Sequence, residues 1–221
     1  SGYGLEMKDL QSFRTWGSLT PGHPEYGHTA GVEMTTGPLG QGVATAVGMA
    51  MAARYERGLL DPTAPANTSL FDHSIWVICS DGDLQEGVSA EASSLAGTQE
   101  LGNLNIIYDD NRISIEGDTH NAFTEDVAAR YRAYGWHVIE VAALSTGNID
   151  LVSLDAAMVA AKKETSKPTL IRMHSVIAWP APKAQGTAGS HGSALGVDEI
   201  KATKIALGLN PDEDFAMPAD V

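Results

Sequence analysis

The chain has 221 residues, 43% of them hydrophobic, a composition that suits one globular α/β domain with a sizeable core. Its formal net charge of −14 disfavours nucleic-acid and anionic-membrane partners, because both select basic surfaces. The single cysteine, Cys79, excludes an intrachain disulfide framework and fits a reducing cytoplasm, and the longest largely apolar stretch, 43–53, is too short to span a bilayer.

Helix-like and strand-like segments alternate along most of the chain. Apolar spacing and β-branched runs predict, in chain order, a helix at 5–13, a helix at 40–58, a strand at 75–79, a helix at 87–101, a strand at 104–108, a strand at 136–141, a helix at 149–163 and a strand at 169–176. This alternation predicts an α/β fold with a mostly parallel sheet and helices on both faces. Residues 180–192, rich in Pro and Gly, predict a mobile surface loop.

Asp81 and Asn111 each follow a strand-like run, and one helix-length segment separates the two runs. The residues lie about 30 positions apart, which is the length of one βαβ unit. Parallel strands joined by a right-handed crossover place their carboxyl ends at the same edge of the sheet, where ligands of open α/β sheets bind. We therefore expect the two side chains to converge there.

Oxygen ligands of this kind suit a hard divalent cation, Mg²⁺ or Ca²⁺. Because Mg²⁺ usually recruits phosphate oxygens as well, a diphosphate is a natural partner, and Gly82 lets the backbone approach it closely. The alternative is structural: Asp81 or Asp83 caps a helix that starts near residue 86, and Asn111 occupies a turn.

Several blocks of sequence decide between these interpretations. The stretch Ser80-Asp-Gly-Asp-Leu-Gln-Glu-Gly87, continued by Asp109-Asp-Asn-Arg-Ile-Ser-Ile115, resembles the thiamine diphosphate fingerprint of the transketolases. Thr20-Pro-Gly-His-Pro-Glu25, Thr35-Thr-Gly-Pro-Leu-Gly-Gln-Gly42 and His191-Gly-Ser-Ala-Leu-Gly196 resemble further blocks of that family, in the family's order. Ser80 and Ile177-Ala-Trp-Pro-Ala-Pro182 resemble actinobacterial members.

The resemblance implies a three-domain parent protein. Residues 1–209 would form its diphosphate-binding domain without the N-terminal part, and residues 210–221 would begin an interdomain linker. The absence of an initiator Met at Ser1 agrees with a chain that begins partway through a domain, and no secretory signal is expected. The implied activity is transfer of a two-carbon ketol unit between sugar phosphates, by a cytoplasmic homodimer that uses thiamine diphosphate and Mg²⁺ or Ca²⁺.

The resemblance also assigns roles to residues of the cofactor site. Asp81, Asn111 and the carbonyl oxygen of Ile113 would hold the metal ion on the diphosphate. The backbone of Gly37 and Leu39 would lie against the aminopyrimidine.

Further roles concern the reacting centre. Ile115 and Ile177 would surround the thiazolium ring, although ordinary core packing explains both residues nearly as well. His23 would face the donor substrate and His191 the diphosphate or the substrate channel. Glu86 would couple, across a subunit interface, to the acidic residue that activates the cofactor in the other chain.

Some features depart from the family pattern. Ser80 replaces the first Gly of Gly-Asp-Gly, Asp83 adds negative charge near the diphosphate unless it points away, and Arg112 follows the metal-binding Asn. The Glu that activates the aminopyrimidine would belong to a domain outside these residues, so the chain alone is expected to be inactive.

Two alternatives remain open. The chain could be a non-catalytic binding or assembly fragment, or part of another thiamine-dependent enzyme such as dihydroxyacetone synthase or 1-deoxyxylulose-phosphate synthase. His23-Pro-Glu25 and Gly37-Pro-Leu-Gly-Gln-Gly42 favour a transketolase over the last of these.

Overall fold

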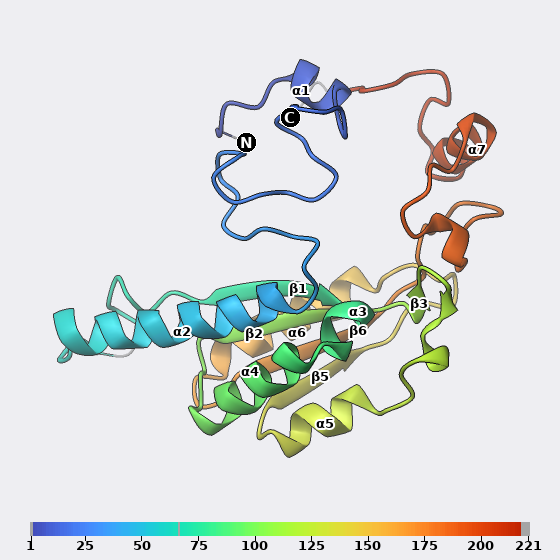
Figure 1. Cartoon of the computed structure of the whole chain (residues 1–221). Coiled ribbons are helices and arrows are strands. Elements are labelled where there is room, and N and C mark those ends of the chain that lie inside the picture. The colour runs from blue at the N-terminus through green and yellow to red at the C-terminus, as the bar shows by residue number, and fades with distance from the viewer. Residues whose placement is uncertain (1, 66, 218–221) are drawn as a thin grey trace.

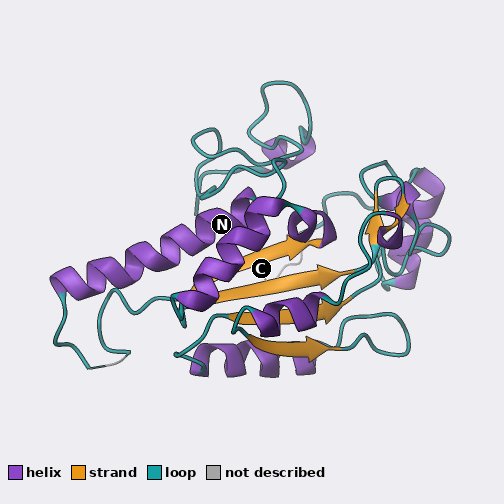
Figure 2. Cartoon of the chain, turned by 60° about the horizontal axis from the view of Figure 1, so that its bottom comes forward, coloured by secondary structure: helices purple, strands orange, loops and turns teal. Residues whose placement is uncertain are grey.

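A computed structural model describes residues 2–65 and 67–217, and its centre is one parallel sheet. Four strands form it, β1 (Ile75–Ser80), β2 (Leu104–Asp110), β5 (His137–Val141) and β6 (Thr169–His174), in the order β1-β2-β6-β5. Every neighbouring pair runs parallel (Figure 1). The predicted α/β fold with a parallel sheet is confirmed, and all four carboxyl ends lie at one edge (Figure 2).

Three helices cover one face of this sheet: α2 (Gln41–Leu60), α4 (Gly87–Thr98) and α5 (Val127–Ala133) (Figure 1). In α2 the buried residues Val43, Ala46, Val47 and Ala50 recur at helical spacing and form a narrow apolar stripe. They pack with strand residues such as Leu104 and Ile106 in the larger core cluster. Small side chains on α2 allow the helix to lie close to β1 and β2.

The opposite face carries α6 (Leu151–Lys163). Ala157 and Ala161 of α6 pack against Val141 and Ile171 in a second, smaller cluster. The N-cap of α6 is Asp150, whose carboxylate accepts hydrogen bonds from the backbone N–H and the hydroxyl of Ser153, at 3.0 and 2.7 Å. The prediction of helices on both faces is therefore confirmed, with a single helix on this side.

The remaining elements are short. They are α1 (Met7–Gln11), α3 (Asp81–Gln85), β3 (Ile113–Ser114) and β4 (Gly117–Asp118), which pair as a hairpin, the 3₁₀ turns η1 (Thr119–Asn121) and η2 (Ala188–Ser190), and α7 (Val197–Ala206). The helix predicted at 5–13 is thus shorter than expected, and the strand predicted at 169–176 ends at His174. The sequence did not predict α3, α5, α7 or the hairpin.

The two ends of the chain lie outside the layered core. Residues that precede α2 form loops and α1 above the sheet, and α7 lies apart from them, beyond the carboxyl edge (Figure 1). Residues 210–217 contact α7 through Lys201 with Asp212, at 2.5 Å, and Lys204 with Asp214, at 2.6 Å. A domain boundary after residue 209 stays a prediction, and residues 218–221 of the predicted linker lie outside the described residues.

The predicted loop at 180–192 has few regular elements, but it is not wholly superficial. It contains η2, and the Ala181 side chain is completely buried. Across the described ranges, none of the helices combines the length with the apolar character that a bilayer crossing requires.

Candidate metal and diphosphate site

Asp81 and Asn111 lie at the same edge of the sheet, as the βαβ spacing predicts. β1 and β2 are parallel neighbours with Ser80 opposite Asp109, so Asp81 and Asn111 follow the ends of adjacent strands. One carboxylate oxygen of Asp81, Oδ2, accepts a hydrogen bond at 3.2 Å from the backbone N–H of Arg112. The segment that begins at Asn111 is thereby joined directly to the end of β1.

The Asp81 carboxylate is buried, with 3% of the residue exposed. Its Oδ1 accepts a hydrogen bond from the hydroxyl of Tyr108. Burial raises the pKa of Asp81 above its ordinary value, and the carboxylates of Asp110 and Asp109 add to this effect, against the lowering effect of the hydrogen bonds from Tyr108 and Arg112. Among the ion pairs of the described residues, none involves Asp81.

A buried carboxylate in negative surroundings that lacks a cationic partner is an unfavourable arrangement unless a cation joins it. The donor chemistry of this edge fits a hard divalent ion, because Asp81 and Asn111 offer oxygen atoms. Within the described ranges, no group of three or more His, Cys, Asp or Glu side chains is arranged for metal binding. The chain would therefore supply only part of a coordination shell, and phosphate oxygens suit the remaining positions.

Asn111 is held in a tight turn. Its Oδ1 accepts a hydrogen bond from the backbone N–H of Ile113 at 3.0 Å, and its Nδ2 lies 3.5 Å from Oδ2 of Asp109. Arg112, which lies between Asn111 and Ile113 in the chain, has a backbone φ of 61°, in the left-handed region that a non-glycine residue seldom adopts. This turn directs the Arg112 N–H towards Asp81 and leads the chain into β3.

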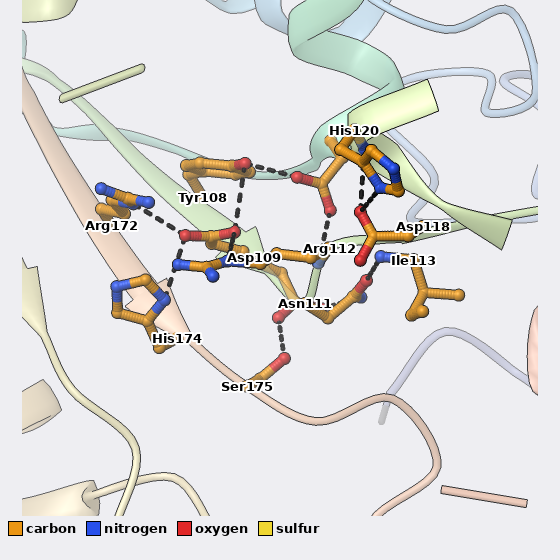
Figure 3. A network of polar contacts seen from close by, with 12 residues as sticks. Tyr108, Asp109, Asn111, Arg112, Ile113, Asp118, His120, Arg172, His174 and Ser175 are labelled. Carbon is orange, nitrogen blue, oxygen red and sulfur yellow. Dashed lines mark hydrogen bonds and ion pairs between the residues drawn. The ribbon is translucent and has the colours of Figure 1, made fainter. Parts of the chain in front are cut away.

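A second set of charged groups, which includes Arg172 and His174 (Figure 3), belongs to the same edge as Asp81. Asp110, at the end of β2, is 3% exposed. Its Oδ2 lies 2.7 Å from Nε of Arg172 and 3.0 Å from Nδ1 of His174, both on the adjacent strand β6. A hollow of about 380 Å³ opens here, lined by residues that include Asp81, Tyr108, Asp110, Arg112 and Arg172.

Sequence reasoning missed this second set. The sequence patterns assign no functional role to Tyr108, Asp110, Arg172 or His174. The sequence feature that could have indicated this set is the alternation along β6. Arg172 and His174 are two residues apart, so they lie on the same face of the strand, and in the sheet they pair with Tyr108 and Asp110 of β2. That signal becomes readable only when the register between β2 and β6 is known.

Neither Asp81 nor Asp83 caps the helix near residue 86, because the N-cap of α4 is Glu86; Asp83 instead belongs to the start of the short helix α3. The Asp83 side chain accepts hydrogen bonds from the backbone N–H and hydroxyl of Ser80, at 2.9 and 3.1 Å, in a capping box at the start of α3. It also accepts one from the backbone N–H of Gly40, at 2.9 Å. The Asp83 carboxylate is therefore directed at backbone donors, and α4 begins separately at Gly87, as predicted.

The glycine-rich segment before α2 approaches the same edge. A Cβ atom on Gly82 would lie 3.2 Å from Cδ1 of Leu39, so these two residues are in contact. A Cβ atom on Gly37 would lie 3.2 Å from the ring of His23. Leu39 and Gly82 are thus brought together with Asp81, and His23 stands against Gly37 in the loop above.

The other predicted site residues are less closely assembled. Glu86 is exposed at the start of α4, and Ile115 is 71% exposed in the β3–β4 hairpin. Ile177 lines a separate hollow of about 300 Å³, together with Asp109 and Ser175. His191 is exposed after η2, and none of the described contacts joins its ring to Asp81 or Asn111. The roles of all the predicted site residues stay predictions.

Comparison with known proteins supplies the family. A model of the family described as "Transketolase, thiamine diphosphate binding domain" matches residues 1–221. The chain is 58% identical over 220 residues to a transketolase of Mycobacterium leprae and 48% identical over 221 residues to one of Bacillus subtilis. All of this chain is covered in both comparisons, but only 31% and 32% of those relatives.

Solved structures agree with the sequence relatives. A transketolase of Pichia stipitis in complex with sedoheptulose 7-phosphate superimposes with a TM-score of 0.89 at 50% identity, covering 99% of this chain and 31% of that one. A transketolase of Campylobacter jejuni gives a TM-score of 0.90 at 46% identity, covering 100% and 33%. The chain spans about a third of the length of the relatives it matches. It belongs to the transketolase family, as a thiamine diphosphate-binding domain.

Proposed function

We propose that this chain supplies the metal-diphosphate half-site of a transketolase, which transfers a two-carbon ketol unit from a ketose phosphate to an aldose phosphate. The substrates would be sugar phosphates, and the partners would be the remaining transketolase domains and a second subunit of a homodimer in the cytoplasm. The family supports this proposal, as does the sedoheptulose 7-phosphate complex of the relative from Pichia stipitis.

The single observation that carries the proposal is the state of Asp81. This carboxylate is buried, lacks a cationic partner among the described residues and is hydrogen-bonded to the segment that begins at Asn111. We propose that Asp81, the Asn111 amide oxygen and the Ile113 carbonyl oxygen hold Mg²⁺ or Ca²⁺, which in turn holds the diphosphate. The thiamine diphosphate would supply the stabilised carbanion that the ketol transfer needs.

The chain's own task would be to bind and orient. Gly82 and the backbone of Gly37 and Leu39 would approach the cofactor closely, and Leu39 contacts Gly82 just after the end of β1. His23, whose ring packs against Gly37, would then face the donor substrate as a hydrogen-bond donor.

Other residues would close the site from the far side. Ile115 and Ile177 would exclude water from the thiazolium ring, and His191 would contact the diphosphate or the substrate channel. Glu86, exposed at the start of α4, would contact the second subunit.

Two departures from the family pattern are compatible with this arrangement. Ser80 serves as the N-cap of α3, a position at which Ser is favoured. Asp83 accepts hydrogen bonds from Ser80 and Gly40, so its charge is compensated by donors of the chain itself.

Calorimetric titration tests the proposed site. Thiamine diphosphate is titrated into the full-length protein with and without Mg²⁺, for the wild type and for Asp81→Ala. We expect Mg²⁺ to strengthen the binding of thiamine diphosphate to the wild type. We expect this Mg²⁺-dependent binding to be abolished in Asp81→Ala, because the ion loses its carboxylate ligand.

A matched control removes a carboxylate elsewhere. Asp155, exposed on α6, lies on the other side of the sheet, and Asp155→Ala is expected to bind like the wild type. Binding that is independent of metal, or that is unaffected by Asp81→Ala, would contradict the proposed site.

A further inference from the structure

Tyr108 stands directly behind the proposed metal ligand. It lies near the end of β2, is 2% exposed, and belongs to the core cluster on the face covered by α2, α4 and α5. Its hydroxyl donates a hydrogen bond to Oδ1 of Asp81, while the Arg112 N–H donates to Oδ2 (Figure 3). Each carboxylate oxygen therefore has one fixed donor, and each keeps lone-pair capacity for a further partner.

The Tyr108 hydroxyl can only act as a donor at this position. Its partner is a carboxylate oxygen, Oδ1 of Asp81, and an ionised carboxylate accepts hydrogen bonds but donates none. The oxygen lies 3.5 Å from Oδ1 of Asp110, a second carboxylate. Since the hydroxyl has one proton and that proton is directed at Asp81, Asp110 must be stabilised by other groups.

Two of those groups come from the next strand, and a third is Arg112, whose Nε lies 3.8 Å from Oδ1 of Asp110. Arg172 and His174 of β6 contact Oδ2 of Asp110 at 2.7 and 3.0 Å. Arg172 is itself held by Glu140 of β5, at 3.5 Å. The Arg172 guanidinium is thus paired with Asp110 and Glu140, and Asp81 is left without a cationic partner among the described residues.

We propose that Tyr108 is a positioning residue for the metal site, which fixes the orientation of the Asp81 carboxylate, and that the Asp110–Arg172–His174 cluster keeps cationic side chains away from Asp81. This inference rests on the proposed function, because it takes Asp81 as a ligand of the divalent ion. The arrangement spans three neighbouring strands, β1, β2 and β6, so a rigid sheet sets the relative positions of its parts.

The expected effect follows from metal sites in general. Groups that orient a metal ligand from behind typically contribute 10- to 100-fold to metal affinity, because a freely rotating carboxylate must be ordered when the ion binds. Tyr108→Phe keeps the ring in the core and removes only the hydroxyl. We expect it to weaken Mg²⁺ binding roughly 10- to 100-fold in the presence of thiamine diphosphate.

The experiment is a calorimetric titration of the full-length protein with Mg²⁺ in the presence of thiamine diphosphate. The titration is then repeated with Ca²⁺. Tyr131→Phe is the matched control. Tyr131 is also a buried tyrosine, 1% exposed, on the same face of the sheet, and its hydroxyl is paired with Oγ of Ser93 at 2.9 Å. A purely structural effect of losing a buried tyrosine hydroxyl would lower metal affinity equally in both variants.

The outcomes separate the two proposals. Weaker metal binding in Tyr108→Phe, with wild-type affinity in Tyr131→Phe, supports the inference. Wild-type affinity in Tyr108→Phe, or equal losses in both variants, overturns it. If Asp81→Ala abolishes metal-dependent cofactor binding while Tyr108→Phe does not change it, the inference fails and the proposed function stands. If Asp81→Ala leaves that binding unchanged, both fail.

Discussion

At the scale of single residues, Gly40 shows why glycines gather before α2. Its φ is 81°, and a Cβ atom here would lie 2.8 Å from both Cβ of Glu86 and Oγ of Ser89. Gly40→Ala therefore combines an unfavourable backbone conformation with a clash against α4. We expect it to lower the free energy of unfolding by about 1–3 kcal/mol, measured by urea unfolding.

A glycine inside α2 provides the control for Gly40→Ala. Gly48 lies exposed in the middle of α2, with no atom within 4 Å of an added Cβ. Gly48→Ala is expected to raise the free energy of unfolding by roughly 0.5–1 kcal/mol, because alanine restricts the unfolded chain and favours the helix. Equal effects of the two substitutions would contradict the packing of Gly40 against α4.

Residue types and spacing are enough to predict that Asp81 and Asn111 lie at the same edge of the sheet, because a βαβ crossover has few possible geometries. The same information could not predict the contact between Asp110 and His174. These two residues are far apart in the sequence and are brought together by the pairing of β2 with β6, which skips β5 in chain order. Pairings of that kind depend on how the whole sheet is assembled.

At the scale of elements, long and periodic segments were predicted well and short ones were not. The helix predicted at 40–58 is α2, and the strand predicted at 104–108 extends two residues further as β2. The two-residue strands β3 and β4 are too short to show an alternation. α7 has no buried residues, so it lacks the apolar stripe by which a helix is recognised.

The start of α6 has a predicted dependence on pH. The hydroxyl and then the N–H of Ser153 hold the pKa of Asp150 below its ordinary value. A lowered carboxyl pKa in the folded state contributes stability that is complete above about pH 4 and is lost as the pH falls through the lowered value. Asp150→Asn keeps a favourable N-cap but cannot titrate.

Urea unfolding of the wild type and Asp150→Asn between pH 6 and about pH 2 measures this contribution. We expect the difference in free energy of unfolding to stay constant down to about pH 4 and then to shift in favour of Asp150→Asn. The comparison cancels the titration of the other carboxylates. A difference that does not vary with pH would show that the Ser153 contacts do not stabilise the ionised form.

At the scale of the whole molecule, the two faces of the sheet are covered unequally. The face carrying α6 leaves Ile78 of β1 78% exposed, although β-branched residues in the middle of a strand are usually buried. The chain also spans only about a third of the length of the relatives it matches.

We therefore expect the 221-residue chain, by itself, to show no ketol transfer from xylulose 5-phosphate to ribose 5-phosphate, whereas a full-length protein that contains it does. The physical reason is that Asp81, Asn111 and Ile113 would hold the diphosphate but the chain offers no identified group to activate the aminopyrimidine. A coupled turnover assay, with thiamine diphosphate and Mg²⁺ in excess, measures this directly.

Two controls are needed for this assay. Circular dichroism of the 221-residue chain must show folded helices, and Asp81→Ala in the full-length protein provides the inactive reference. Turnover by the folded chain alone would mean that the catalytic groups all lie within these residues, and the division of the site between domains would have to be abandoned.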